Sequence, residues 1–344
     1  MKLYEKINNK KTYVIAEMSA NHAGSLDTAK EIIWAAKESG ADCLKIQTYT
    51  ADTLTLDCDN EYFKIKNGLW KGENFYHLYG RAYTPWEWHA ELKAETEKAG
   101  MDFLSTPFDN SAVDFLESIG VEFYKIASFE LIHIPLIRYV ASKGKPIIMS
   151  TGMGTLAEID EAVSAIRNEG NNQIVLLRCA SAYPAITSEM NLATMKNMAE
   201  TFNVPVGLSD HSAGSIGAVT AVALGATVIE KHFCLSRNCN SADAAFSMEP
   251  AEFASMVKDI RQVEKAIGNV KYGPAPQEMG SVSKRRSIFC SNDILKGEKF
   301  TEKNIKVVRP GAGLHPRYYE MLIGKTASID IKKGTPIDFG MFKD

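Results

Sequence analysis

The chain has 344 residues, of which 45% are hydrophobic and 24% charged, and its formal net charge is −3. This composition is typical of a globular protein, and the length suits a barrel of roughly 250 residues with a small appended domain. The slight negative charge argues against a nucleic-acid-binding protein that depends on bulk positive potential. Residues 1–11 are polar and charged, which excludes a secretory signal there, and the apolar runs are too short to span a bilayer.

Short apolar runs alternate with helical patterns over the first three quarters of the chain. The runs predict strands at 13–17, 43–47, 102–105, 122–126, 146–150, 173–178, 204–209 and 227–232. The patterns between and after them predict helices at 26–39, 85–99, 109–119, 135–142, 156–169, 191–202, 215–224 and 250–267. Eight such repeats indicate an α/β fold, a (β/α)₈ TIM barrel.

A long insert, residues 49–83, follows the second predicted strand and is rich in aromatic side chains, including Trp70. Long loops on the carboxyl-end face of a barrel commonly shape a substrate pocket. The alternative is a partly ordered excursion on the surface.

The helical pattern stops near residue 268. Residues 269–286 contain Gly273, Pro274 and a basic run, and we interpret them as a linker between a catalytic barrel at 1–268 and a small β-rich domain at 287–344. The small domain contains a weak repeat, 293–297 and 330–334, in which each copy resembles strand–turn–strand. The six scattered cysteines form no C-x-x-C motif, and we expect reduced thiols in a cytoplasmic protein.

Polar side chains gather where the predicted strands end. Lys45 and Lys125 lie within apolar strands, where an unpaired charge is costly. Two converging lysines with hydroxyl groups would form a cradle for phosphate or carboxylate. The hydroxyl candidates are Ser105, Thr106, Ser128, Ser150, Ser181 and Ser209.

Two histidines, His211 and His232, end consecutive predicted strands. Neighbouring strands lie roughly 5 Å apart, so both imidazoles can reach one divalent ion. The alternative is a hydrogen-bonded pair of core histidines. Glu17 and Glu130 suit acid–base work or sugar binding, or else ion pairs with Lys45 and Lys125. The chain lacks H-E-x-x-H, G-x-G-x-x-G, Walker A and G-x-S-x-G, which disfavours metalloproteases, nucleotide-binding enzymes and serine hydrolases.

Taken together, these segments resemble the sialic acid synthase family over nearly the whole chain, and the tail resembles its antifreeze-like SAF domain. The first-strand motif has the form typical of the pseudaminic acid branch. The matching segments are 15–22 (IAEMSANH), 44–47 (LKIQ), 105–108 (STPF), 124–126 (YKI), 150–153 (STGM), 183–184 (YP), 207–211 (GLSDH), 230–233 (EKHF) and, in the tail, 309–311 (RPG).

The resemblance implies condensation of phosphoenolpyruvate (PEP), an open-chain N-acetylated sugar and water to a nonulosonic acid and phosphate. It implies catalytic roles for Glu17, Gln47, His211 and His232, with the two histidines holding Mn²⁺, or Mg²⁺ or Co²⁺ in its place. The implied PEP ligands are Lys45, Thr106, Lys125, Ser128, Ser150, Ser181 and Ser209. Ser181 departs from the Asn that is usual in the sialic branch.

For the sugar, the resemblance implies 2,4-diacetamido-2,4,6-trideoxy-L-altrose, giving pseudaminic acid; the alternative is a sialic or legionaminic acid synthase. The implied sugar-binding residues are Glu17, Glu130, Tyr183, Asp243 and Arg309. Arg309 would come from the SAF domain of a partner, in a domain-swapped homodimer with no nucleic-acid or membrane partner. The alternative enzymatic function is a Schiff-base aldolase that uses a strand-end lysine. The alternative non-catalytic function is that of a sugar- or ice-binding protein.

Overall fold

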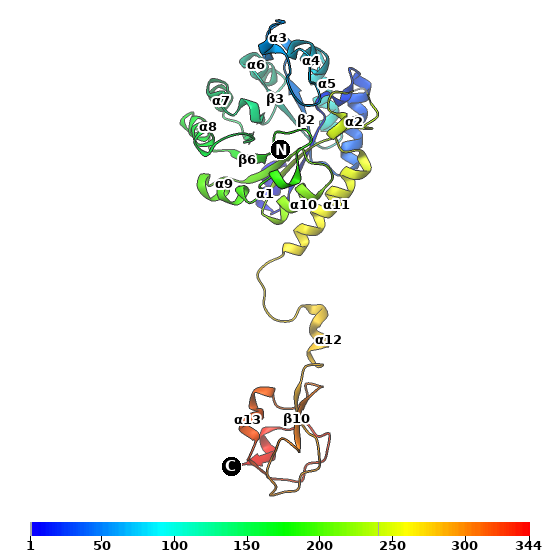
Figure 1. Cartoon of the computed structure of the whole chain (residues 1–344), viewed down its shortest axis with the longest axis vertical. Coiled ribbons are helices and arrows are strands. Elements are labelled where there is room, and N and C mark those ends of the chain that lie inside the picture. The colour runs from blue at the N-terminus through cyan, green and yellow to red at the C-terminus, as the bar shows by residue number, and fades with distance from the viewer. Residues whose placement is uncertain (1, 240) are drawn as a thin grey trace. The chain divides into compact units, whose positions relative to one another are not determined.

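The computed structural model describes residues 2–239 and 241–344 and contains two compact units, Met1–Gly268 and Asn269–Asp344. In the first unit, eight parallel strands close into a barrel in the order β1 to β8. Figure 1 shows helices arranged around these strands. The predicted TIM barrel is therefore confirmed.

All eight predicted barrel strands are present, and their ends differ from the expected ends by two residues or fewer. The observed strands are β1 (Tyr13–Glu17), β2 (Cys43–Thr48), β3 (Asp102–Pro107), β4 (Tyr124–Ile126), β5 (Ile147–Ser150), β6 (Ile174–Cys179), β7 (Val206–Asp210) and β8 (Val228–His232).

The predicted helices also form, and the first unit contains three short helices that the sequence pattern did not reveal. The helices of the first unit are α1 (Leu3–Asn8), α2 (Leu26–Glu38), α3 (Ala51–Leu54), α4 (Phe75–Ala82), α5 (His89–Lys98), α6 (Asn110–Ser118), α7 (Ile134–Ala141), α8 (Leu156–Asn168), α9 (Thr194–Phe202), α10 (Ile216–Ala223) and α11 (Pro250–Ile267). The unexpected helices are α1, α3 and α4, of which α3 and α4 lie in the insert after β2. Helix α1 packs Leu3, Tyr4 and Ile7 against the apolar cluster inside the barrel.

Alternation along the strands separates two functions of the barrel interior. Successive side chains of a strand point to opposite faces, so residues two apart share one face. On β1, Tyr13 and Ile15 belong to the buried apolar cluster inside the barrel, and Glu17 follows them on the same face. On β8, Val228 belongs to that cluster, and Glu230 and His232 follow in the same way. Polar groups therefore occupy the carboxyl end of the interior, above an apolar floor.

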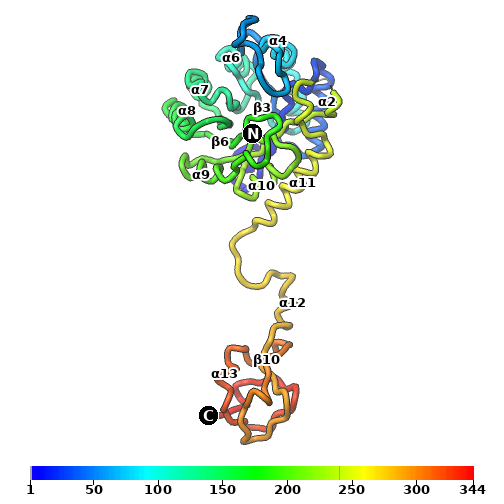
Figure 2. Tube along the Cα trace, in the orientation of Figure 1, coloured from blue at the N-terminus to red at the C-terminus, as the bar shows by residue number. Residues whose placement is uncertain are grey.

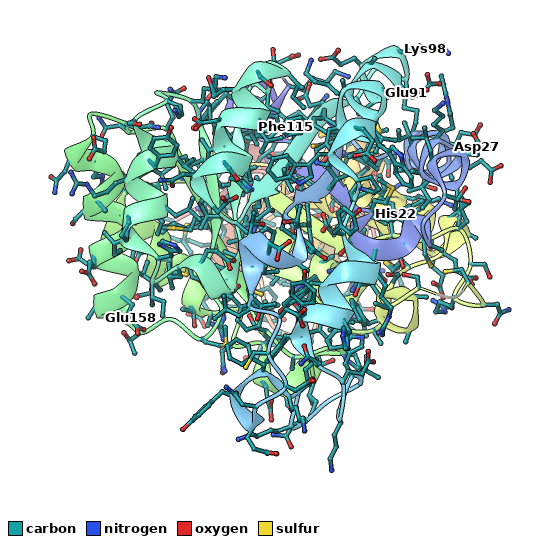
Figure 3. The ribbon with its side chains drawn as sticks, turned by 90° about the horizontal axis from the view of Figure 1, so that it is seen from above. His22, Asp27, Glu91, Lys98, Phe115 and Glu158 are labelled. Atoms are coloured by element: carbon teal, nitrogen blue, oxygen red, sulfur yellow. The ribbon has the colours of Figure 1, made fainter. Side chains whose placement is uncertain are left out.

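Helices on the outside of the barrel are joined by exposed polar contacts. Figure 3 shows α2 and α5 side by side, with Asp27 on α2 and Glu91 and Lys98 on α5. The Trp34 Nε1 atom of α2 donates to Glu95 of α5 over 2.8 Å.

His22, also labelled in Figure 3, is buried and contacts Thr84 Oγ1 through Nε2 over 3.3 Å. Burial lowers the pKa of His22 to about 4, which keeps this imidazole neutral.

The second unit is the C-terminal part of the chain, whose trace runs from orange to red in Figure 2. It has a small apolar core and short antiparallel strand pairs. Its strands and helices are β9 (Ser287–Cys290), β10 (Ile305–Val308), β11 (Thr326–Ala327), β12 (Phe342–Lys343), α12 (Met279–Val282) and α13 (Tyr319–Leu322). Strand β9 pairs with β10 and β11 pairs with β12.

The two copies of the weak repeat pair with each other in this unit. Ile294 and Ile331 form an antiparallel bridge through mutual backbone hydrogen bonds of 2.8 Å. Asp293 accepts from the Lys333 backbone, and Asp330 accepts from the Lys296 backbone in the equivalent way. The repeat is therefore a pair of related turns that stabilise one another.

Across the described residues, the structure contains no helix long and apolar enough to cross a membrane.

Candidate active site

The two strand lysines lie at the same end of the barrel interior, and both are buried. Lys45 Nζ forms an ion pair with Glu17 Oε2 over 2.8 Å and contacts Thr106 Oγ1 at 3.4 Å. Lys125 Nζ donates to Ser150 Oγ over 2.6 Å. Burial alone would lower the pKa of Lys45, but Glu17 and Glu230 outweigh it and raise that pKa. Burial dominates at Lys125 and lowers its pKa.

Glu230 joins the two lysines and was missed by the sequence analysis. Its Oε1 lies 3.5 Å from Lys45 Nζ and accepts from Ser209 Oγ at 3.4 Å, and its Oε2 lies 3.9 Å from Lys125 Nζ. Burial tends to raise the pKa of Glu230, but Lys125 and Lys45 outweigh burial and lower it. Glu230 is therefore a buried carboxylate shared between two cations. Its position two residues before His232 was the available signal, because both belong to the interior face of β8.

Hydroxyl groups from two further loops meet at Gly152, two residues after Ser150. Gly152 N donates to Ser128 Oγ over 3.1 Å. A Cβ atom on Gly152 would meet Ser181 Oγ at 2.1 Å and Ser128 Oγ at 2.7 Å, so the approach of these groups depends on glycine. Besides the two lysines, four predicted PEP ligands thus contact or approach Lys45, Lys125 or Gly152, and the last, Ser209, contacts Glu230.

Ser105 does not belong to this group. It lies on the opposite face of β3 from Thr106, where its Oγ contacts Thr48 Oγ1 at 2.6 Å, and Thr48 Oγ1 contacts His89 Nε2 of α5 at 2.9 Å. The expectation that Ser105 lines the cradle is wrong, because neighbouring residues of a strand cannot share a face. Ser105 instead helps to join the barrel wall to α5.

The two histidines face each other, with ring centroids 5.4 Å apart. His211 Nδ1 contacts the Ala180 carbonyl at 3.2 Å, which leaves Nε2 of this tautomer as a lone-pair donor. His232 Nδ1 is buried and has no hydrogen-bond partner in the described part of the chain. Burial, then His211, Lys45 and Lys231, hold the pKa of His232 well below its usual range, so the imidazole is neutral.

These features fit a divalent ion. Neutral imidazole is the form that binds metals, and a buried ring nitrogen without a partner is costly unless a ligand satisfies it. Within residues 2–239 and 241–344, no third His, Cys, Asp or Glu completes a metal-binding cluster with them. The protein therefore supplies two nitrogen ligands at most from this group of side chains, and oxygen ligands from water and substrate would have to complete the coordination.

A buried ion pair ties the two histidine-bearing strands together. Lys231 Nζ donates to Asp210 Oδ2 over 2.8 Å, and both side chains are almost fully buried. Asp210 Oδ1 also accepts from the backbone and hydroxyl groups of Ser212, at 2.9 and 2.7 Å. Lys231 precedes His232 and Asp210 precedes His211, so this ion pair lies on the outer face of the same strand ends.

Four of the five predicted sugar-binding residues, Glu17, Glu130, Tyr183 and Asp243, are found in the barrel unit. Tyr183 lies over the histidines, with its ring centroid 4.3 Å from that of His211. Asp243 is buried and accepts from Ala20 N over 3.2 Å. Glu130 is buried and its Oε2 has no partner in the described structure. Arg309 is an exposed residue of the second unit, directly after β10.

Gln47 Nε2 donates to Glu17 Oε1 over 3.0 Å. Burial chiefly raises the pKa of Glu17 to about 7, and Glu230 adds to the rise while Lys45 opposes it. The carboxyl of Glu17 thus anchors both Lys45 and Gln47. The contact between Glu17 and Lys45 is the ion pair that the sequence suggested as the alternative role of Glu17.

Glu130 makes stability depend on pH in the substrate-free protein. Burial raises its pKa from 4.5 to about 7, so the folded state binds this proton more tightly than the unfolded state. The contribution is fully present below pH about 4.5 and is lost as the pH rises through about 7, a change of up to about 3 kcal/mol. We expect the free energy of unfolding to fall over this range and Glu130→Gln to reduce the fall, measured by urea unfolding at several pH values. An identical pH dependence in the variant would contradict this assignment.

Comparison with known proteins places the chain in a family. The NeuB family model matches residues 32–272, and the SAF domain model matches residues 285–343. The pseudaminic acid synthase of Campylobacter jejuni is 46% identical over 97% of this chain and 98% of its own length. The N,N'-diacetyllegionaminic acid synthase of Legionella pneumophila is 36% identical over 94% of this chain and 93% of its own.

A solved structure supports the same relationship. The crystal structure of the N-acetylneuraminic acid synthetase from Leptospira borgpetersenii, in complex with citrate, is 32% identical and has a TM-score of 0.69. The match covers 79% of this chain and 90% of that one. With a family model over most of the barrel unit and relatives of nearly equal length, the chain belongs to the NeuB family.

Proposed function

We propose that the protein is a pseudaminic acid synthase, which condenses PEP with 2,4-diacetamido-2,4,6-trideoxy-L-altrose and water to give pseudaminic acid and phosphate. The observation that carries this function is the meeting of a buried lysine–hydroxyl cluster with a pair of buried histidines at one end of one barrel. The choice of sugar is supported by the higher identity to a relative named pseudaminic acid synthase than to one named legionaminic acid synthase.

PEP carries a phosphate and a carboxylate, and the cradle offers matching groups. Lys45 and Lys125 supply the positive charge, and each already contacts a hydroxyl, Thr106 Oγ1 and Ser150 Oγ respectively. We assign both pairs to the two anionic groups of PEP. Charge-assisted hydrogen bonds of this kind are roughly twice as strong as neutral ones. The remaining proposed ligands are Ser128, Ser181 and Ser209.

Glu17 and Glu230 favour the charged form of Lys45 before PEP arrives, whereas burial outweighs the nearby carboxylate at Lys125. Without a counter-ion, a buried lysine tends to lose its proton, because burial penalises the charged form. Lys45 lies 2.8 Å from Glu17 and 3.5 Å from Glu230. The incoming anion then replaces part of this interaction. Lys45 therefore already carries its proton when PEP binds and does not have to acquire one.

His211 and His232 would hold the divalent ion, for which we propose Mn²⁺. When bound, such an ion acts as a Lewis acid that polarises the aldehyde oxygen of the open-chain sugar. Tyr183, packed on His211, holds the sugar above the imidazoles and excludes water from this side of the site. Glu130 and Asp243 are assigned to sugar hydroxyl and amide groups, and Glu130 offers an unpartnered oxygen for this purpose.

The reaction forms a bond between C3 of PEP and C1 of the aldehyde, whose oxygen takes the electron pair of the C=O bond, and leaves a cationic C2 stabilised by its oxygen. Water adds to C2 and gives up one proton, which balances the new hydroxyl at C1. The C2–O bond to phosphate then breaks, and the remaining proton of the water leaves with phosphate to give the 2-keto acid. Because the amide nitrogen of Gln47 donates to Glu17, its carbonyl oxygen is oriented to accept from a water molecule. We assign Gln47 to positioning the water that attacks C2.

Release of phosphate tests this function directly. We expect the purified protein to release phosphate from PEP with the diacetamido-trideoxy sugar, more slowly with other acetamido sugars, and not after treatment with EDTA until Mn²⁺ is restored. A Schiff-base aldolase would instead be trapped by borohydride with pyruvate, without metal. Trapping of Lys45 or Lys125, or no phosphate release with any acetamido sugar, would refute the synthase.

We further propose a cytoplasmic homodimer in which residues 269–286 link the barrel to a domain-swapped SAF domain. The six free cysteines are consistent with a reducing compartment. Arg309 belongs to the second compact unit and its side chain is exposed, which leaves it available to the sugar site of a partner.

Mixing two impaired variants at limiting sugar tests the swapped site. Arg309→Ala is expected to raise the KM for sugar about tenfold or more while KM for PEP changes little, because a lost charged hydrogen bond is worth roughly 1.5–3 kcal/mol. Mixing Arg309→Ala with Lys125→Met subunits should restore part of the activity, since heterodimers contain one intact site. If the mixture shows only the sum of the two activities after subunit exchange, Arg309 does not act across subunits.

A further inference from the structure

The insert after β2 contains a hydrogen-bonded hairpin whose tip carries Trp70. Its base is closed by the antiparallel bridge between Lys64 and Asn74. The backbone of Ile65 adds two hydrogen bonds of 2.8 Å, donating to Glu73 O and accepting from Gly72 N. Gly68 and Gly72 flank the tip with φ of 84° and 93°, in the region that favours glycine. The tip is thus a hydrogen-bonded turn, and Trp70 lies in it.

The base of the hairpin is held in place from both sides. Asn74 is buried, caps α4 through Tyr76 N at 2.8 Å, and donates to the Cys58 carbonyl over 2.8 Å. Tyr49, at the start of the insert, is buried and packs edge-on against Phe108, with ring centroids 5.3 Å apart. The insert is therefore anchored to the barrel, and these contacts fix the position of its tip.

Aromatic rings connect this tip with the histidine pair. The Trp70 ring lies 6.3 Å from Tyr183 and 6.5 Å from Phe246, measured between centroids. Tyr183 and Phe246 are 5.0 Å apart, and they contact His211 and His232 at 4.3 and 4.9 Å respectively. Three rings from three separate loops thus form one apolar wall that runs from the imidazoles outward to Trp70.

We propose that Trp70 is a specificity-determining residue, which completes an apolar wall with Tyr183 and Phe246 that receives the 6-deoxy end of the acceptor sugar. This inference rests on the proposed function. The aldehyde carbon has to lie at the histidines, and C6 is the carbon farthest from it along the open chain. The outermost ring of the wall is Trp70, so it is the ring best placed to meet that end.

The chemistry of the wall favours a methyl group over a hydroxymethyl group. Aromatic faces bury apolar area and offer little to satisfy a hydroxyl that leaves water. An apolar pocket discriminates about 100-fold against a ligand that differs only by an added hydroxyl. Sugars with a hydroxyl at C6 would therefore bind less well, although the PEP cradle would treat both in the same way.

Kinetics of Trp70→Ala distinguish a role in sugar selectivity from a general structural role. We expect KM for the diacetamido-trideoxy sugar to rise about tenfold, KM for PEP to stay within about twofold, and Trp70→Phe to retain most of the affinity for the sugar. Tyr62→Ala is the matched control, because Tyr62 belongs to the same insert and its side chain is 85% exposed. Equal changes in both KM values, or the same effect from Tyr62→Ala, would overturn the proposal.

Discrimination at C6 gives the sharper result. The ratio of kcat/KM between the diacetamido-trideoxy sugar and its 6-hydroxy counterpart should narrow about tenfold in Trp70→Ala, and an unchanged ratio would overturn the assignment. Addition of the sugar should also change tryptophan fluorescence in the parent protein and lose most of that change in Trp70→Phe. If the parent protein turns over the sugar but its fluorescence response persists in Trp70→Phe, the inference fails and the proposed function stands. If the parent protein releases no phosphate with any acetamido sugar, the proposed function itself fails.

Discussion

Replacement of His232 with alanine is expected to weaken Mn²⁺ binding at least about 100-fold and to lower kcat/KM about 10²- to 10³-fold, because one of two imidazole ligands is lost. His211→Ala should behave in the same way. The Mn²⁺ affinity of the metal-stripped protein, measured by calorimetry or by the EPR signal of free Mn²⁺, checks binding apart from turnover.

A matched control for these variants is His77→Ala, since His77 is an exposed residue of α4 and lies outside the histidine pair. It should retain both metal affinity and activity. Full activity of His232→Ala in the presence of EDTA would contradict the metal role. The same result would leave the alternative from the sequence, a pair of hydrogen-bonded core histidines, as the better description.

Replacement of Lys231 with methionine is expected to produce the largest loss of stability. It leaves the Asp210 carboxylate buried without its cation, and breaking such a pair costs roughly 3–5 kcal/mol. For a domain of this size we expect the melting temperature of the barrel to fall by about 10 °C. Adding Asp210→Asn to Lys231→Met should recover part of the loss, because a neutral amide replaces the unpaired charge.

The second unit contains a natural control for this experiment. Lys332 and Asp293 form an ion pair of similar length, 2.9 Å, but their side chains are 81% and 54% exposed. Lys332→Met should change stability by no more than about 1 kcal/mol, since solvent screens an exposed pair. If Lys231→Met were equally mild, or if Asp210→Asn gave no recovery, the pair would not be the buried tie between β7 and β8 that we describe.

The sequence predicted the barrel well because its signals are local. Alternating apolar runs and helical patterns depend on neighbouring residues, so the strands were placed within two residues of their observed ends. Helix α1 was missed, because a six-residue polar segment shows little periodicity until Leu3, Tyr4 and Ile7 meet the barrel interior. The pairing of Ile294 with Ile331 was missed for a related reason, since a repeat shows similarity and not contact.

The site was predicted less completely than the fold. Strand ends identified Lys45, Lys125, His211 and His232, but position along a strand does not by itself give the face. Ser105 therefore entered the predicted cradle although it points to α5, and Glu230 was left out although it joins both lysines. Alternate residues of a strand share one face, so following each strand from its apolar interior residues would have excluded Ser105 and included Glu230.

The sequence by itself determined the fold class, the strand ends at which chemistry occurs and the resemblance that suggested the reaction. Only the tertiary structure decided which side chains meet: Glu230 between Lys45 and Lys125, and Trp70 against the rings above the histidines. The physical reason is that secondary structure follows from local backbone preferences and periodicity, whereas pairing of charges and rings depends on barrel closure. Closure brings β8 beside β1 and the insert over the loops after β6 and β8, across separations that no local pattern encodes.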